Sequence, residues 1–170
     1  MYETIMSRRS VKCYKSDMPS NELIDKVIEA GLYAANGRNW QSPIIIAITD
    51  KAVRDKLSAL NAKVMGAEGS DPFYGAPVVL VVLADKTKRT YLYDGSLTMG
   101  NMMLAAHSLG LGACWIHRAK EEFESEEGKE ILKMLGIEGD YEGIGNLILG
   151  YADGEGREAD PRNENRVFKI

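Results

Sequence analysis

A cluster of basic residues near the N-terminus has the chemistry of a phosphate site. Arg8, Arg9 and Lys12 place three positive charges within five residues, and Ser10 adds a hydroxyl donor. Guanidinium groups match phosphate oxygens bidentately, and the hydroxyl supplies a further hydrogen bond. A solvated basic turn has the same composition, so this cluster alone leaves both interpretations open.

A second cluster is rich in side-chain amides. Between Asn36 and Gln41 the chain has two asparagines, one arginine and one glutamine, next to Trp40. Amides both donate and accept hydrogen bonds, which suits the polar edge of a planar heterocycle better than an apolar substrate. Trp40 could stack on such a ring or simply pack within the protein.

A third candidate is the glycine-containing segment GLGACW at residues 110–115. Gly110 and Gly112 would let a flat ligand approach the backbone closely, although an ordinary helix-to-strand turn needs the same residues. Other motifs are absent from the sequence. Gly143 and Gly145 precede a strand-like run rather than follow one, so they form no dinucleotide fingerprint, and there is no Walker sequence or G-x-S-x-G motif.

Composition narrows the class of protein. The 170 residues are 45% hydrophobic and 27% charged, which predicts one globular domain. The net charge of −4 argues against nucleic acid or an anionic membrane as a partner. The chain has two cysteines, Cys13 and Cys114, and two histidines, none at the spacing of metal ligands, so we expect no metal site. So few cysteines also favour a reduced, cytoplasmic protein. The N-terminus has no apolar segment typical of a secretory signal.

The elements that must position these residues centre on an uncharged segment at 97–116. Its first part favours a helix, which Gly110 ends, and residues 113–116 favour a short buried strand. A helix that is apolar nearly all round must be covered nearly all round, in a core or at a subunit interface. Asn101 and His107 are too polar for a membrane span.

The remaining pattern alternates helices with strands. Ser20 and Asp50 are expected helix N-caps, and a loop at 66–77 is expected to be mobile. We expect helices at 2–6, after Ser20, after Asp50 and at 120–135, and strands at 44–48, 78–83, 146–149 and 167–170, the first two buried on both faces. This indicates an α/β sandwich of four or five strands. The polar arm at 151–165 and the strand after it could pair within their own chain or add to a second subunit's sheet.

Taken in order, these segments resemble the FMN-dependent nitroreductase family over almost the whole chain. The matching segments are Ser7-Arg8-Arg9-Ser10-Val11-Lys12, AANGRNWQSP at 34–43, Gly75-Ala76-Pro77, Asp94 and Leu97 leading into LAAHSLGLGACWI at 104–116, Gly150-Tyr151 and the basic tail at 162–166. The resemblance implies an α+β fold: a three-layer α/β/α sandwich with a mixed central sheet, built as an intertwined homodimer. Residues 1–170 would form a single FMN-binding domain whose C-terminal arm, about 151–170, crosses to the partner subunit.

The resemblance also assigns roles around the cofactor, which lies between subunits in the family. Arg8 and Arg9, completed by Arg162 or Arg166, would hold the phosphate. The ring would be bound by Ser10, Lys12, Asn36, Asn39 and Gln41, the last three possibly from the other subunit, and by the backbone at Trp115, Ile116 and His117. Lys12 would stabilise negative charge on the reduced ring.

The implied activity is ping-pong reduction of a nitroaromatic, a quinone or a similar small acceptor by NADH or NADPH, with no protein side chain acting as acid or base. Alternatives are another flavin reaction such as reductive dehalogenation, a flavin-binding protein without useful turnover, and a protein without flavin. The chain departs from the family at His117-Arg118, where many members have an acidic residue and glycine. It also lacks the long insertion that helps to wall the substrate pocket, so an open site is expected.

Overall fold

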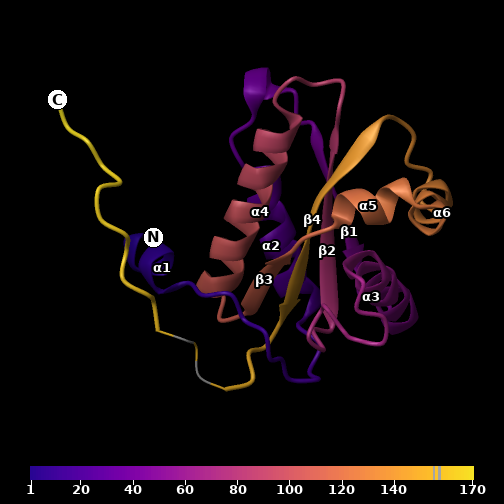
Figure 1. Cartoon of the computed structure of the whole chain (residues 1–170), viewed down its shortest axis with the longest axis horizontal. Coiled ribbons are helices and arrows are strands. Elements are labelled where there is room, and N and C mark those ends of the chain that lie inside the picture. The colour runs from indigo at the N-terminus through magenta and orange to yellow at the C-terminus, as the bar shows by residue number, and fades with distance from the viewer. Residues whose placement is uncertain (155, 157) are drawn as a thin grey trace.

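The chain forms three layers, with one sheet between two groups of helices (Figure 1). The computed structural model describes residues 1–154, 156 and 158–170; positions 155 and 157 of the predicted arm lie outside that description. The strands are β1 (Pro43–Ile48), β2 (Val78–Asp85), β3 (Gly112–Ile116) and β4 (Tyr141–Gly150). The helices are α1 (Tyr2–Ser7), α2 (Asn21–Leu32), α3 (Lys51–Met65), α4 (Tyr91–Ser108), α5 (Ala119–Glu124) and α6 (Glu126–Met134), with a 3₁₀ turn η1 (Gly37–Asn39).

The sheet has the strand order β1-β2-β4-β3, and neighbouring strands are antiparallel. The predicted α+β class is confirmed. Within the described residues, the parallel part of the predicted mixed sheet is reduced to an isolated bridge between Ser10 and Ala113. The N-terminal segment therefore touches the β3 edge, whereas the β1 edge has no partner strand among the described residues.

Strand β2 separates two hydrophobic cores because its side chains alternate between the two faces of the sheet. Leu80 and Val82 pack with α2 and α4 on one face. Val79 and Val81 pack with α3 and α5 on the other face. Since helices cover both faces, β2 is apolar without alternation, as the sequence predicted.

Local capping signals place the helix ends correctly. Ser20 Oγ accepts from Leu23 N at 3.3 Å, and Asp50 Oδ1 accepts from Val53 N at 2.9 Å. The single helix expected at 120–135 is wrong, because the chain breaks at Ser125 into α5 and α6. The Ser125 hydroxyl accepts from Gly128 N at 3.1 Å and so starts a second helix.

Two strand predictions differ from the structure. The run at 44–48 is not buried on both faces: β1 lies at the sheet edge, and Ala47 is exposed. Residues 167–170 form no strand within this chain. Val167 and Phe168 are 77% and 84% exposed, and the C-terminal segment runs away from the body of the chain (Figure 1).

Helix α4 is covered on one side only. Met99 and Met102 are fully buried against the sheet, whereas Leu92, Tyr93 and Leu97 are 47%, 72% and 49% exposed. A helix that is apolar on its exposed side is typical of an interface between chains. No helix in the described part of the chain has the length and hydrophobicity of a membrane span.

Candidate functional site

Backbone contacts fix the N-terminal basic segment beside the sheet. Val11 N donates to Ala113 O at 3.1 Å, and Lys15 N donates to Tyr151 O at 2.9 Å. The Val11 side chain fills the space where a Cβ of Gly112 would stand, 3.0 Å away. Gly112 therefore admits the chain's own N-terminal segment, and the prediction that it lets a flat ligand approach is wrong in this structure.

Two cavities of about 330 Å³ each share Ser10 and Lys12 in their linings. The first, here the β3 cavity, is lined by Ser10, Lys12, Met65, Pro72, Tyr74, Cys114, Trp115, Ile116, His117 and Arg118. The second, here the arginine cavity, is lined by Arg8, Arg9, Ser10, Lys12, Glu158, Ala159, Asp160 and Arg162. The structure thus brings together eight of the predicted site residues from three distant parts of the sequence.

The arginine cavity contains donors that have no protein acceptor. Arg9 Nη1 donates to Met6 O at 2.8 Å and to Arg8 O at 2.7 Å, which fixes the orientation of its guanidinium. Arg8 Nη1 and Arg9 Nε are buried and have no hydrogen-bond partner among the described residues. Buried charged donors without partners cost free energy, so this arrangement favours an external anion with several oxygens.

The β3 cavity combines aromatic and basic side chains. A Cβ at Gly145 would lie 2.3 Å from Trp115 Nε1, so the indole can cross β4 only because glycine stands there. Lys12 Nζ lies 5.5 Å from the centre of the Tyr74 ring. A flat ligand in this cavity would meet an aromatic residue and a cation.

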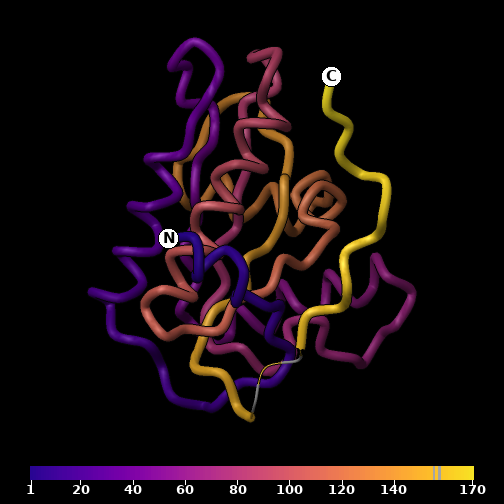
Figure 2. Tube along the Cα trace, turned by 90° about the vertical axis from the view of Figure 1, so that its left-hand side faces the viewer, coloured from indigo at the N-terminus to yellow at the C-terminus, as the bar shows by residue number. Residues whose placement is uncertain are grey.

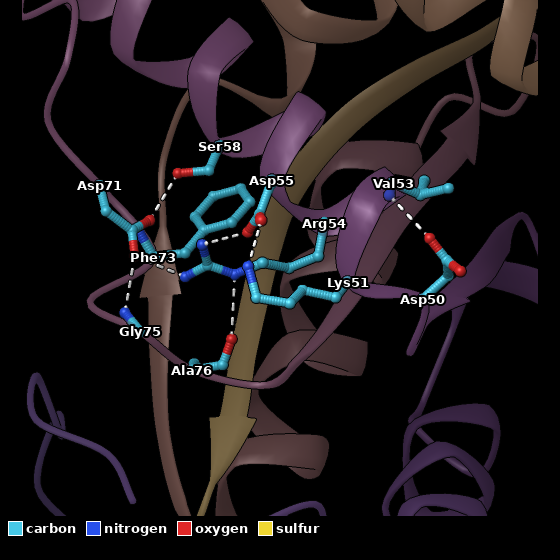
Figure 3. Close-up of polar contacts among 10 residues, drawn as sticks. All are labelled: Asp50, Lys51, Val53, Arg54, Asp55, Ser58, Asp71, Phe73, Gly75 and Ala76. Atoms are coloured by element: carbon cyan, nitrogen blue, oxygen red, sulfur yellow. Dashed lines mark hydrogen bonds and ion pairs between the residues drawn. The ribbon is translucent and has the colours of Figure 1, made fainter. Parts of the chain in front are cut away.

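The loop at 66–77, which contributes Pro72 and Tyr74, is held by one carboxylate rather than free (Figure 3). Asp71 Oδ2 accepts from Arg54 Nη2 and from Gly75 N, both at 2.7 Å. Asp71 Oδ1 accepts from Ser58 Oγ at 2.5 Å and from Phe73 N at 3.0 Å. Burial acts to raise the pKa of Asp71, but these hydrogen bonds outweigh it and hold the pKa below its ordinary value. The expected mobile loop is therefore tied to α3.

The turn at His117 and Arg118 has its own support. Arg118 adopts a left-handed backbone with φ of +81°, at the position where many family members have glycine. Arg118 Nε donates to Asn61 Oδ1 at 3.0 Å, and Asn61 Nδ2 donates to His117 O at 2.8 Å. Asn61 Nδ2 also donates to the carboxylate of Glu122.

Glu122 is a carboxyl group buried behind this turn. It is 0% exposed and accepts from Asn146 Nδ2 at 2.8 Å as well as from Asn61. Burial raises the pKa of Glu122 to about 7, although the two amides and the Arg118 charge oppose the shift. The side chain can therefore change its protonation state near neutral pH.

Several of these residues were missed in the sequence. Arg54, Ser58 and Asn61 point from α3 toward the two loops, whereas the sequence reading of this helix used only its apolar residues. Their spacing, four and then three residues apart, was the available signal, because it aligns polar side chains on one helical face. Tyr74 carried no such signal, since its position depends on contacts distant in sequence, and Arg118 was noted only as a departure from the family pattern.

The structure does not bring the amide-rich loop to either cavity. Asn36 Oδ1 accepts from Gln41 N at 3.0 Å, and Gln41 Nε2 donates to Asn39 Oδ1 at 3.3 Å, so their contacts are local. The loop lies at the far end of the molecule from the N-terminal basic segment in both views (Figures 1 and 2). Arg166 is exposed and lines neither cavity, whereas Arg162 lines the arginine cavity.

Three comparisons place this architecture among known proteins. The chain is 34% identical over 120 residues to a Methanothermobacter thermautotrophicus protein, an alignment that covers 66% of this chain and only 58% of that relative. It is 30% identical to an Archaeoglobus fulgidus protein, covering 97% of this chain and 94% of the relative. Both relatives are provisionally named NADH dehydrogenase/NAD(P)H nitroreductase.

A solved structure shows the same fold at full length. The nitroreductase of Desulfitobacterium hafniense, determined with bound FMN, superposes with a TM-score of 0.88 at 25% identity and covers 99% of this chain and 97% of its own. The model of the nitroreductase family matches residues 5–151. The predicted resemblance is confirmed: the chain belongs to the nitroreductase family.

Proposed function

We propose that this chain is an FMN-dependent oxidoreductase that uses NADH or NADPH to reduce nitroaromatics, quinones or similar acceptors. Family membership and the flavin- or nicotinamide-related names of its relatives support an oxidoreductase. The observation that carries the cofactor assignment is the pair of adjoining cavities. One offers buried arginine donors without a protein partner, and the next offers an aromatic and basic lining.

The residues that line the two cavities fit the chemistry of FMN. Arg8, Arg9 and Arg162 would hold the phosphate, because they supply charged donors at the arginine cavity. Ser10 and Lys12 lie at the boundary and would meet the polar edge of the ring. Trp115, Ile116 and His117 would lie against the ring, through backbone that β3 holds in place.

Bound FMN would supply the hydride chemistry, accepting from the nicotinamide and then donating to the acceptor in a ping-pong sequence. The protein's contribution is to bind the cofactor, to orient it and to tune its reduction potential. Lys12 stabilises negative charge at the ring edge, which favours the reduced cofactor. No side chain has to act as acid or base in this scheme.

We also propose that the working unit is a homodimer. Exposed apolar side chains lie on both α1 and α4: Tyr2, Ile5 and Met6 of α1 are 71%, 51% and 55% exposed beside the C-terminal end of α4, and Leu92 and Tyr93 are exposed at the N-terminal end of α4. Apolar surface of this kind on neighbouring helices favours association.

The arm at 151–170 would cross to the partner, where Val167 and Phe168 would add to the free edge of β1. The partner would in turn bring Asn36, Asn39 and Gln41 to the ring, since these residues lie away from the cavities of their own chain. Arg166, the alternative to Arg162 as a phosphate ligand, lies on the same crossing arm. We propose a cytoplasmic location because both cysteines, Cys13 and Cys114, are free thiols.

The test is the visible spectrum of the purified protein, followed by anaerobic addition of NADH and then NADPH. Flavin absorption bands that bleach with either nucleotide, and return with a quinone or nitroarene, are the expected result. Bands that neither nucleotide bleaches would contradict the reductase. A colourless protein that does not take up added FMN would contradict the cofactor assignment itself.

A further inference from the structure

Helix α3 has a buried polar stripe beside its apolar face. Arg54, Ser58 and Asn61 are 7%, 3% and 0% exposed, and their spacing aligns them on one side of the helix. Burying polar side chains costs free energy unless each one is hydrogen-bonded. Each of the three bonds to a residue beyond α3, so the stripe holds other segments in place.

The N-terminal end of the stripe holds Tyr74. Arg54 and Ser58 bind Asp71, and Asp71 accepts the N–H groups of the residues on both sides of Tyr74 (Figure 3). Arg54 Nε also donates to Ala76 O at 3.1 Å. Tyr74 has φ of +52°, an unfavourable conformation for an aromatic residue that persists only where the surroundings enforce it.

The C-terminal end of the stripe holds Arg118. Asn61 binds the Arg118 side chain and the carbonyl of His117, and the buried Glu122 fixes the Asn61 amide. Arg118 is likewise strained, with φ of +81°. One helix thus supports two left-handed residues from two separate loops.

Both strained residues line the β3 cavity. In the proposed function, Ser10, Lys12 and residues 115–117 meet the flavin ring, which leaves the Tyr74 ring and the Arg118 charge to meet an acceptor stacked on it. None of the described residues that line this cavity is acidic. A lining with this composition favours a planar ligand that bears a negative charge.

We propose that Arg54, Ser58 and Asn61 are positioning residues for Tyr74 and Arg118, which select planar aromatic acceptors that carry an anionic group. The inference rests on the proposed function and extends it from the reaction to the class of acceptor. Tyr74 supplies the flat surface, and Arg118 pairs with the anion.

The test compares 4-nitrobenzoate with the neutral, similarly shaped 4-nitrobenzamide, with NADH or NADPH as donor. We expect a higher kcat/KM for 4-nitrobenzoate, and Arg118→Gly should lower the ratio of the two values by about tenfold or more, as the loss of one hydrogen bond to a charged group implies. Glycine accepts the left-handed backbone, so this variant should fold. Lys133→Gln removes an exposed charge on α6, outside the cavity, and should leave the ratio unchanged.

A double-mutant cycle tests the positioning role. Asn61→Ala should lower the same ratio in the wild-type background and have no further effect on it in the Arg118→Gly background. Tyr74→Leu should raise the KM for both nitroarenes without changing the ratio, because the lost surface is uncharged.

Three results would overturn the proposal: no wild-type preference for the anion, an Arg118→Gly ratio equal to wild type, or an Asn61→Ala effect that is the same in both backgrounds. If the wild-type protein still binds FMN and is bleached by a nicotinamide, these results refute the selectivity and leave the proposed function intact. A wild-type protein that binds no FMN refutes both.

Discussion

The two edges of the sheet differ in how completely a single chain builds them. At the β3 edge, the N-terminal segment is bonded to Ala113, and the loops containing Tyr74 and Arg118 are tied to α3. At the β1 edge, the strand has no second partner among the described residues, and the side-chain amides of Asn36, Asn39 and Gln41 bond only within their own loop and its start.

This difference suggests a division of labour between two copies of the chain. In the proposed function, the β3 end would supply the rigid, basic half of the cofactor site. The β1 end and the C-terminal arm expose apolar side chains such as Phe168, together with the amide groups that the family resemblance assigns to the ring. On this account, the surfaces that are unsatisfied in one chain become buried in a dimer.

The largest effect should come from removing the arm. Deleting residues 160–170 removes Val167, Phe168 and Ile170, and burial of each such side chain contributes roughly 1.5–3 kcal/mol. Sedimentation equilibrium should show a dimer dissociation constant raised by about a thousandfold or more. Replacing the same three residues by serine keeps the arm's length and should have nearly the same effect. A truncated chain that stays dimeric and retains FMN would contradict the crossing arm.

A smaller effect is expected from the phosphate end of the site. Arg8→Ala removes the buried, unpartnered Nη1 donor and should raise the Kd for FMN by about tenfold to a hundredfold, measured by fluorescence titration. Arg8→Lys should fall in between, because lysine keeps the charge and loses the bidentate geometry. Unchanged FMN affinity in Arg8→Ala would contradict the phosphate assignment.

The third prediction concerns the rigid half alone. The pKa of Glu122 rises from its ordinary 4.5 to about 7 on folding, so the folded chain holds this proton more tightly than the unfolded chain. Its contribution to stability is therefore full below pH 4.5 and is lost as the pH rises to about 7, on the order of 2–3 kcal/mol. The charges facing it are Arg118, which opposes the shift, and Glu121, which adds to it.

Urea unfolding at pH 5 and pH 8 measures this effect. The free energy of unfolding of Glu122→Gln, relative to wild type, should be higher at pH 8 than at pH 5. Glu121→Gln, an exposed neighbour, should show a much smaller change. The same difference should persist in the arm-truncated chain, because each chain builds this network by itself. A pH-independent difference would contradict the buried, titrating carboxyl.

Sequence reasoning succeeded where the determinants are local. Ser20 and Asp50 cap their helices, and β2 is a buried strand. Ser10 and Lys12 of the basic segment also lie beside Trp115, as the family resemblance implied.

The features that the sequence did not predict depend on contacts between residues that are far apart in the chain. The loop at 66–77 resembles a mobile segment until Arg54 and Asp71, 17 residues apart, are seen to bind each other. The β-branched run of β1 resembles a central strand because apolar edge residues look the same whether their second neighbour is internal or a second chain. Asn61 and Glu122 are both 0% exposed and bind each other, but they are 61 residues apart, so no local pattern indicates the contact.

The most direct test of the two-copy site is complementation between defective chains. Arg8→Ala should damage the phosphate end of one site, and Asn39→Ala should damage the ring contact given to the partner's site. When the two variants are co-expressed with different tags, each heterodimer should hold one site with both residues intact and one site lacking both. We predict that purified heterodimers regain one tight FMN site, by fluorescence titration, that neither homodimer has. Heterodimers with only weakened sites would show that both residues serve the same chain's site, and would contradict this account.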